Sequence, residues 1–551
     1  MSAPLSAADH RSTMFENPPT TIMGILSRLG PGLIIAGSIV GSGELIATTK
    51  TGAEAGFWLL WLILIGCVIK VFVQVELGRD TIIRGKSTMD ALGEVPGPRI
   101  AGRGNWLIWY YLIMFLASAA QLGGIAGAVG QAMAISMPLT ADGQRFNQIA
   151  NAETELKTGE AEFKALTADL QTPPVATGRV GELMIRNQEL RDALVKLGPR
   201  PATNYDPQIW ASVIAVVTSI LLVVGKYKLI EWSTTTMVAA FTLTTVGTVI
   251  ALQFTEFWAI RFSDIVDGLS FRLPPSSQSG SQQALATALA TFGIIGVGAS
   301  ELVSYPYWCL EKGYARYTGP RDNSPEWAAR ARGWLTVLRW DCWCSMVIYT
   351  LATLAFYLLG AAILGRVGLN PGGFELVRTL TAMYEPVFGK FAQSLFLVGA
   401  FAVLFSTFFV ANAGHARVLT DVARVMNFGV KSDADVKRSI RILSGILPFI
   451  CLSIYLAVPK EPQQLVLLSG MVQAFMLPML ASAALYFRYA RGDDRLRPGK
   501  VWDAFLWIST LGMFIAAGCL IYKSTSDFRK EQSAKPAVEK TESPESDTKQ
   551  K

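Results

Sequence analysis

The sequence predicts an all-α protein that crosses a membrane many times and carries two similar helix breaks. Apolar residues make up 51% of the 551 residues and charged residues only 17%, which is too little charge for a soluble protein of this size. Eleven apolar runs are long enough to cross a bilayer. One six-residue pattern occurs in both the first and the sixth run, as Gly41-Ser42-Gly43-Glu44-Leu45-Ile46 and as Gly298-Ala299-Ser300-Glu301-Leu302-Val303.

Each expected span is an apolar run of at least about 18 residues, the length that a helix needs to cross the hydrocarbon layer. Two spans broken at corresponding places are typical of secondary transporters with internal repeats. We therefore expect spans 1–5 and 6–10 to form an inverted repeat, with span 11 at its periphery. The eleven runs lie at roughly 31–53, 57–78, 105–137, 208–225, 229–253, 284–310, 334–363, 390–413, 440–457, 463–487 and 502–523.

Basic residues gather in the loops that follow spans 2, 6, 8 and 10. Examples are Arg84, Arg321, Arg424 and Arg491. These four loops lie on one side of the membrane if every run crosses it, and the positive-inside rule makes that side cytoplasmic. We therefore expect a cytoplasmic N-terminus, an external C-terminus and a location in a bacterial inner membrane.

Three parts of the chain are expected to lie outside the membrane. Between spans 3 and 4, a polar insertion predicts two amphipathic helices, 147–170 and 179–197, around Thr172-Pro173-Pro174. The insertion is either a cap that shapes access or a decoration without a transport role. The expected division is an N-terminal tail at 1–24, spans at 25–137, the insertion at 138–206, spans at 207–523, and a disordered tail rich in Lys, Glu, Ser and Pro at 524–551.

Several function classes are disfavoured. The six cysteines and two histidines do not occur at metal-ligand spacing, and the sequence has no Walker-type phosphate loop, so a zinc site and an ATP-driven pump are not expected. No nucleophile and base stand out as a pair, so we expect neither an enzyme nor a bound cofactor. The net charge of +7 arises mostly from the loops and does not indicate nucleic-acid binding.

The repeated glutamates predict a binding site for a cation. A carboxylate at membrane depth is costly, and an unwound helix is tolerated there where it lines a cavity or is buried in protein. Two carboxylates that face one cavity repel each other, and either a divalent cation or a shared proton relieves the repulsion. The alternative is that each glutamate only caps its own half-helix. The expected ligands are Glu44 and Glu301, with backbone carbonyls near 36–40, Gly41 and 295–298, and with Ser38, Ser42 and Ser300 as supporting groups.

The first span also carries Gly30-Pro31-Gly32, then Ala36, then the break, then Gly52-Ala53-Glu54-Ala55-Gly56-Phe57. This order resembles the first span of the Nramp family of divalent-metal transporters, which has the leucine-transporter fold. The resemblance extends from about residue 25 to 490 and implies an inverted repeat of five plus five helices with an eleventh span. Its further positions are Leu59-Leu60-Trp61, Gln74, Leu77-Gly78, Gly85-Lys86, Lys226-Tyr227, Glu231, Asp341 and Leu477-Pro478.

The binding residues of the family are replaced in this chain. Where the family has Asp-Pro-Gly-Asn, this sequence has Gly41-Ser42-Gly43-Glu44, and where the family has a metal-binding Met and a Pro, it has Ser300-Glu301. Loss of a thioether and gain of oxygen donors favour hard cations such as Mg²⁺, Ca²⁺ or Mn²⁺. The comparison implies a departure from proton-coupled manganese and iron uptake toward the magnesium-transporting branch.

The proton route of the family is also altered. Its acidic pair in the third span aligns with Ser118 and Gln121, and the histidines of its sixth span align with Leu302 and Tyr307. None of these side chains titrates near neutral pH. Two alternatives follow: transport is not coupled to protons, or the two glutamates carry out the proton chemistry.

Four other polar residues in the spans are candidates for the site: Lys70, Asp341 and Gln121 as supporting groups and Gln473 as a metal ligand. Lys70 in span 2 either pairs with a glutamate or extends toward the interface beside Glu76. Asp341 in span 7, close to Arg339, is expected to form a structural or gating ion pair. Gln473 in span 10 lies one turn from Met476, where the family has a glutamine ligand, and is a candidate oxygen donor.

The sequence thus predicts a secondary transporter that moves a divalent cation, and protons on one of the two alternatives, across a lipid bilayer. Two other functions stay open. One is transport of an amino acid or an organic cation by the same fold, and the other is a non-transporting receptor that uses the outer insertion. The ion, the direction of flux and the oligomeric state are not determined by the sequence.

Overall fold

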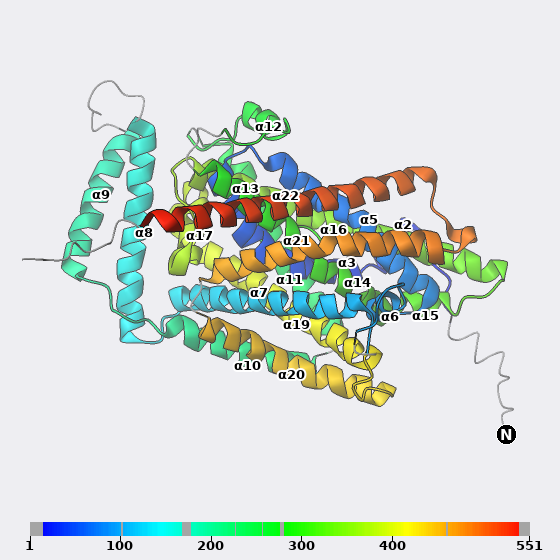
Figure 1. The fold of residues 1–551 in the computed structure, drawn as a ribbon. Coiled ribbons are helices and arrows are strands. Elements are labelled where there is room, and N and C mark those ends of the chain that lie inside the picture. Colours follow the sequence, from blue (N-terminus) through cyan, green and yellow to red (C-terminus); the bar gives the residue numbers. More distant parts are fainter. Residues whose placement is uncertain are drawn as a thin grey trace, which may run out of the picture.

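The computed structural model is an all-helical bundle with eleven helices long and apolar enough to cross a membrane among the described residues (Figure 1). The described residues are 15–100, 103–167, 178–225, 227–255, 257–275, 280–458 and 461–538. Lys226 and the stretch Thr172-Pro173-Pro174 therefore lie outside them. The eleven predicted runs coincide with the eleven helical spans, which confirms the all-α polytopic fold.

Most spans are single continuous helices, and several carry a short irregular helix at one end. The first and the sixth are divided into two half-helices. In order, the spans are α3 (Pro31–Ile39) with η1 (Ser42–Thr48) and α4 (Thr49–Ala55), α5 (Leu60–Arg84), α7 (Trp106–Ser136), α10 (Asp206–Val224), α11 (Tyr227–Leu252), α13 (Ser281–Ile294) with α14 (Ala299–Lys312), α16 (Pro325–Leu359) with η2 (Gly360–Gly365), α19 (Ala392–Val425), α20 (Asp433–Ala457), α21 (Pro462–Tyr486) with η6 (Phe487–Arg491), and α22 (Lys500–Val538).

Short helices connect the spans or flank them. They are α2 (Ile22–Leu26), α6 (Thr88–Gly93), α12 (Phe262–Gly268), α15 (Tyr314–Thr318), η3 (Gly373–Glu375), α17 (Leu376–Thr381), η4 (Ala382–Tyr384), α18 (Glu385–Phe388), η5 (Gly389–Phe391) and η7 (Asp494–Leu496). The segment from η3 to η5 joins spans 7 and 8, and we call it the 7–8 linker.

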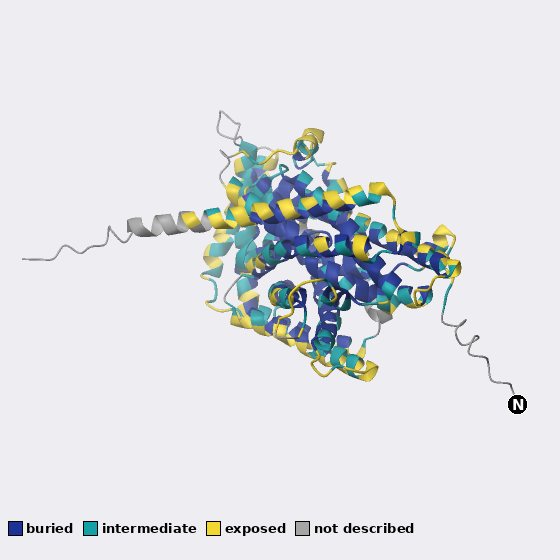
Figure 2. Ribbon diagram, turned by 45° about the vertical axis from the view of Figure 1, so that its right-hand side comes forward, coloured by how far each residue is buried: buried dark blue, intermediate teal, exposed yellow. Residues whose placement is uncertain are grey.

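The two broken spans form the centre of the bundle. In the most apolar window of span 1, 94% of the residues are buried, and 89% are buried in span 6, against 28% in spans 4 and 9. Figure 2 shows the corresponding buried interior with exposed residues around it. The other spans exclude lipid and water from the breaks, because α5, α16, α19 and α21 pack against them.

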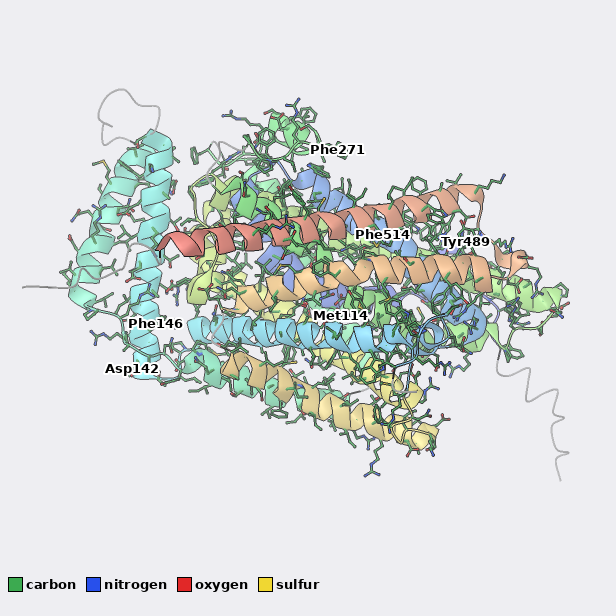
Figure 3. The ribbon with its side chains drawn as sticks, in the orientation of Figure 1. Met114, Asp142, Phe146, Phe271, Tyr489 and Phe514 are labelled. Atoms are coloured by element: carbon green, nitrogen blue, oxygen red, sulfur yellow. The ribbon has the colours of Figure 1, made fainter. Side chains whose placement is uncertain are left out.

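Apolar side chains cover the outer surface of the bundle, as expected for contact with lipid. Phe514 on α22 is 50% exposed and Val398 on α19 is 72% exposed. Figure 3 shows Phe514 on α22 and Tyr489 near the end of the bundle opposite α8. The eleventh span thus packs along the repeats with one face and leaves the other open, as a peripheral helix does.

The polar insertion is a pair of helices, α8 (Ala141–Thr167) and α9 (Gly178–Leu197), which lie across one end of the bundle (Figures 1 and 3). Ion pairs tie them to each other, for example Arg179 to Glu162 at 2.9 Å. Others tie them to the 7–8 linker: Arg186 binds Glu385 at 3.1 Å, and Arg200 binds Glu375. We call this end of the molecule the insertion end.

The four basic loops meet at the opposite end, which we call the basic end. Arg84, the last residue of α5, binds Glu94, and Arg491, the last residue of η6, lies 3.7 Å from the same carboxylate. Arg424, near the end of α19, binds Asp90. Arg321 after span 6 binds Asp493 at 2.9 Å. These pairs join all four loops on one side of the membrane-spanning region.

The C-terminal segment differs from its prediction. Residues 524–538, expected to be disordered, continue α22 as a helix to Val538. The polar composition that suggested disorder is compatible with a helix that extends beyond the apolar region, because Lys, Glu and Gln have good helix propensity. Residues 539–551 lie outside the described residues.

Candidate functional site

Glu44 lies in the first turn after the break of span 1 and is completely buried. Its Oε1 accepts hydrogen bonds from the Thr353 hydroxyl of α16 at 3.1 Å and from the backbone N–H of Gly296 at 3.3 Å. Its Oε2 has no hydrogen-bond partner among the described residues. A buried carboxylate oxygen without a partner is costly and is a position where a ligand fits.

Glu301 lies in the first turn of α14, directly after the break of span 6. Its Oε1 accepts a hydrogen bond from the Ser38 hydroxyl of α3 at 3.1 Å. Its Oε2 accepts one from the Ser300 hydroxyl at 3.2 Å. The side chain is only partly buried, in contrast to Glu44.

Each glutamate is therefore hydrogen-bonded by the broken span of the other repeat. Glu44 of span 1 is bonded by Gly296, which is in the break of span 6, and Glu301 of span 6 is bonded by Ser38 of span 1. These contacts place each carboxylate at the break of the opposite repeat. The alternative that each glutamate only caps its own half-helix does not account for these crossed contacts.

Two glycines allow the breaks to approach other elements closely. Gly296 has φ +56°, a left-handed conformation that favours glycine, and a Cβ there would lie 2.9 Å from the Cα of Cys67. At Gly41 a Cβ would lie 1.9 Å from the Thr407 hydroxyl of α19. The Gly41 carbonyl, expected as a ligand, accepts the N–H of Leu45 at 2.8 Å inside its own helix.

Two glutamines extend the site through hydrogen bonds. Gln473 Oε1 accepts a hydrogen bond from the N–H of Ser300 at 3.2 Å, and it lies 3.0 Å from the Ser300 hydroxyl, which can donate to it or to Glu301. Gln473 Nε2 donates to Gln121 Oε1 at 2.8 Å, and Gln121 Nε2 donates to the Ser42 hydroxyl at 2.9 Å. The chain of contacts connects the residues after both breaks through α21 and α7. Gln121 thus belongs to the hydrogen-bond network of the site. The sequence had indicated this position only through its alignment with the acidic pair of the family.

Lys70 contradicts both sequence interpretations. It is fully buried on α5 rather than extended toward the interface. It forms no ion pair within 4 Å with any described carboxylate, Glu44 and Glu301 included. Its Nζ donates instead to the carbonyls of Phe292 and Ile295, the latter at 2.7 Å. The ammonium therefore occupies the carboxyl end of α13, and the Ile295 carbonyl is not the free ligand that the sequence suggested.

Asp341 is bound to backbone and not to Arg339. Its Oδ1 accepts the N–H of Gly30 at 2.9 Å, and its Oδ2 accepts the N–H of Gly32 at 2.6 Å and the Tyr305 hydroxyl at 2.9 Å. Gly30 and Gly32 lie at the start of half-helix α3, where the free N–H groups and the helix dipole favour a negative charge. Asp341 is a helix cap rather than half of an ion pair.

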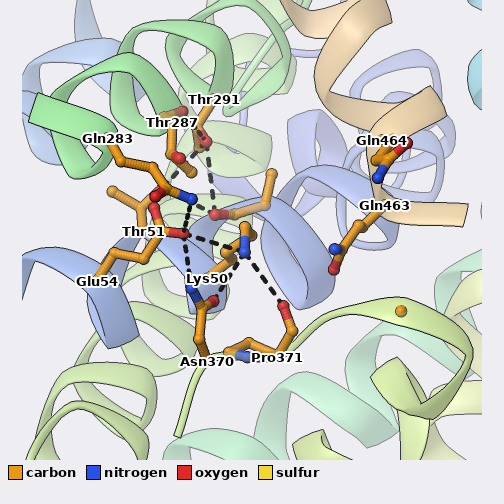
Figure 4. Close-up of polar contacts among 12 residues, drawn as sticks. Lys50, Thr51, Glu54, Gln283, Thr287, Thr291, Asn370, Pro371, Gln463 and Gln464 are labelled. Carbon is orange, nitrogen blue, oxygen red and sulfur yellow. Dashed lines mark hydrogen bonds and ion pairs between the residues drawn. The ribbon is translucent and has the colours of Figure 1, made fainter. Parts of the chain in front are cut away.

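A polar cluster between the breaks and the insertion end was not predicted from the sequence. Lys50 is buried and binds Glu54 at 3.0 Å and the Asn370 side chain at 2.7 Å (Figure 4). The Lys50 ammonium also reaches the Pro371 carbonyl at 3.3 Å. At the next residue, the hydroxyls of Thr51 and Thr291 are 3.0 Å apart, which joins span 1 to span 6. The i,i+4 spacing of Lys50 and Glu54 was the available signal.

The described residues contain no group of three His, Cys, Asp or Glu side chains that could hold a metal ion. A surface pocket at the basic end, lined by Arg79, Asp80, Arg488 and Arg491 among others, shares no residue with the breaks.

The sequence model of the family described as natural resistance-associated macrophage protein-like, or Nramp, matches residues 201–523, more than half of the chain. The chain belongs to the Nramp family. Its similarity to the curated members it matches is local: the divalent metal cation transporter MntH of Mycobacterium tuberculosis is 28% identical over 116 residues. This match covers 21% of the chain and about a quarter (26%) of the length of that relative.

Solved structures of Nramp-type transporters share the fold over nearly the full length. A variant of the manganese transporter of Eremococcus coleocola superposes with a TM-score of 0.53 at 13% sequence identity, covering 93% of this chain and 90% of that one. The same transporter in complex with an aromatic bis-isothiourea compound gives a TM-score of 0.52 at 14% identity, covering 94% and 92%. This Nramp chain thus has the leucine-transporter-type inverted repeat of five plus five helices with an eleventh span.

Proposed function

We propose that this Nramp protein is a secondary transporter that moves a divalent metal cation across the membrane by alternating access. The observation that carries the proposal is the crossed arrangement of Glu44 and Glu301, each bonded by the broken span of the opposite repeat. A cation bound between them neutralises two charges that otherwise repel each other in a medium of low dielectric constant. Family membership supports the same class of substrate.

The donor set favours a hard ion such as Mg²⁺ or Mn²⁺. The groups available at the breaks are carboxylate, amide and hydroxyl oxygens, from Glu44, Glu301, Gln473 and Ser300. Oxygen donors suit hard cations, and Mg²⁺ often keeps part of its water shell, so it needs few protein ligands. We assign Glu44 and Glu301 as direct ligands. Gln473 and Ser300 are assigned as groups that orient Glu301 or a bound water. Gly41 and Ser42 support the break.

Two sets of contacts, one on each side of the breaks, support alternating access, and we call each set a closure. Toward the insertion end, Lys50, Glu54 and Asn370 join span 1 to the segment that follows span 7. Toward the basic end, Asp341 holds the start of α3. We place the basic end in the cytoplasm of a bacterial cell by the positive-inside rule, and we propose that access alternates as the two closures break in turn.

The proposal is tested by uptake of Mg²⁺, Mn²⁺ and Ca²⁺ into proteoliposomes. The Glu44→Gln, Glu301→Gln double variant is expected to lose at least about 90% of the uptake of the preferred ion, because both charges that attract it are removed. Glu311→Gln is the matched control, since Glu311 lies on the same helix as Glu301 but binds Arg417 at the basic end.

Unchanged uptake by the folded double variant would reject these residues as the site. Absence of uptake of all three ions by the wild-type protein, together with binding of amines that the metals do not displace, would favour an organic-cation transporter instead. Adding a proton-sensitive dye inside the vesicles shows in the same assay whether protons move with the ion.

A further inference from the structure

The two half-helices that end at the breaks have their carboxyl ends satisfied in different ways. At the end of α3, the Gly37 carbonyl accepts hydrogen bonds from the hydroxyls of Ser406 and Thr407, both at 3.3 Å. At the end of α13, the carbonyls of Phe292 and Ile295 accept the ammonium of Lys70. One end thus has hydroxyl donors and the other has the amino group of a lysine side chain.

The Lys70 ammonium has the surroundings of a bound alkali cation. It lies at the negative end of a helix dipole, against two backbone carbonyls, and its Nζ is 4.8 Å from the centre of the Phe292 ring. Glu44 accepts the N–H of Gly296, and Lys70 donates to the Ile295 carbonyl, so the two side chains bind the same peptide unit. Carboxyl ends of broken helices and unwound carbonyls are the groups that coordinate monovalent driving ions in transporters with such breaks.

We propose that the carboxyl end of α13 is a monovalent-cation site that this chain fills with its own side chain, Lys70. The tethered ammonium replaces a diffusible ion: it satisfies the carbonyls, keeps the break in place and reduces the repulsion between the two carboxylates. Transport then needs no separate alkali cation at this position. The site itself is independent of which substrate the transporter carries.

The proposal predicts that removing the side chain vacates a site that Na⁺ or K⁺ can fill. Lys70→Ala leaves the two carbonyls without their donor and an open space where the lysine side chain was. Lys70→Met removes the charge but keeps most of the volume, so it leaves no room for an ion. The two variants separate an ion-binding role from a packing role.

The experiment is thermal unfolding of the purified full-length protein in detergent at equal ionic strength, with NaCl, KCl or choline chloride. For Lys70→Ala we expect a saturable rise in Tm of several degrees with Na⁺ or K⁺ over choline, since a ligand that binds only the folded state stabilises it. For the wild type and Lys70→Met we expect the same Tm in all three salts.

An equal response of the wild type and Lys70→Ala to the alkali cations would overturn the proposal. So would a Lys70→Ala protein with the same Tm in all three salts, or one that fails to fold in every salt, because Na⁺ or K⁺ should then replace the ammonium. These readouts do not use transport, so they stand apart from the test of the proposed function.

In proteoliposomes, uptake by Lys70→Ala is expected to depend on external Na⁺ or K⁺, while uptake by the wild type is not.

Discussion

Spans 2 and 7 occupy equivalent positions in the two repeats, and each carries one buried charged residue that contacts the broken span of the other repeat. Lys70 on α5 binds the carboxyl end of α13, and Asp341 on α16 binds the amino end of α3. Each charge therefore meets the end of a helix dipole that attracts it. The comparison shows that the repeats are equivalent in fold but not in charge, since one supplies a cation and the other an anion.

The difference also separates two kinds of function. Asp341 is bonded to two N–H groups at the start of α3 and to the Tyr305 hydroxyl, so it acts on the position of α3. Lys70 binds the Ile295 carbonyl of the peptide unit whose Gly296 N–H binds Glu44, so we expect it to act on the charge of the site as well as on the position of α13. Breaking each contact separately tests this distinction.

The largest loss of stability is expected from Asp341→Ala. Three donors lose a charged acceptor, and the start of α3 is left with unsatisfied N–H groups, which we expect to cost about 3 kcal/mol of the free energy of unfolding. Thermal or denaturant unfolding in detergent measures it. Asp341→Asn is the matched control and is expected to cost less, about 1 kcal/mol, because its amide oxygen still accepts a hydrogen bond. Equal losses in the two variants would contradict the capping role.

A smaller loss is expected from Lys70→Met, because the side-chain volume is kept and only the hydrogen bonds to two carbonyls are removed. We expect about 2 kcal/mol, measured in the same way. The exposed Lys500→Met substitution on α22 is the control and should change stability by less than about 0.5 kcal/mol. A Lys70→Met protein as stable as the wild type would show that the ammonium does not hold the break.

The smallest effect is expected at a carboxylate outside the membrane, Asp493, which serves as a reference for the two buried charges. A hydrogen bond from Arg495, helped by Arg321, lowers the pKa of Asp493 from 3.8 to about 2. A carboxylate whose pKa is lower in the folded than in the unfolded protein stabilises the folded state at pH values above its unfolded-state pKa. This stabilisation is lost as the pH falls through about 4 toward 2.

Asp493→Asn is therefore expected to cost about 1 kcal/mol at pH 7, and the difference from the wild type should shrink as the pH is lowered to 3. Unfolding of both proteins between pH 3 and 7 measures it. Asp494→Asn is the control. The Asp494 carboxylate is largely exposed, so this variant should differ less from the wild type in stability at every pH. A difference that grows at low pH would contradict the assigned ion pairs.

Much of the fold was predictable because it follows from local sequence. The number and approximate limits of the spans follow from apolar runs, and the two breaks follow from glycines and glutamates that are adjacent in the chain. The same reasoning placed Glu44 and Glu301 directly after the breaks. It was wrong where a segment is polar but helical, as at 524–538, since composition does not distinguish a disordered tail from an extended helix.

The partners of the buried polar residues were not predictable in the same way. Lys70 was expected beside a glutamate or at the interface, yet it binds carbonyls 222 and 225 residues further along the chain. Asp341 and Gln121 likewise have partners on distant spans. Hydropathy and spacing describe one helix at a time, whereas these contacts depend on which faces of different helices meet.

The sequence by itself determined that the chain crosses the membrane eleven times, that spans 1 and 6 are broken, and that one glutamate follows each break. Only the tertiary structure decided that the glutamates are bonded across the repeats and that an ammonium occupies the end of α13. The physical reason is that hydrophobicity and helix breaking act over neighbouring residues, whereas buried charges take the partners that packing brings within hydrogen-bond distance.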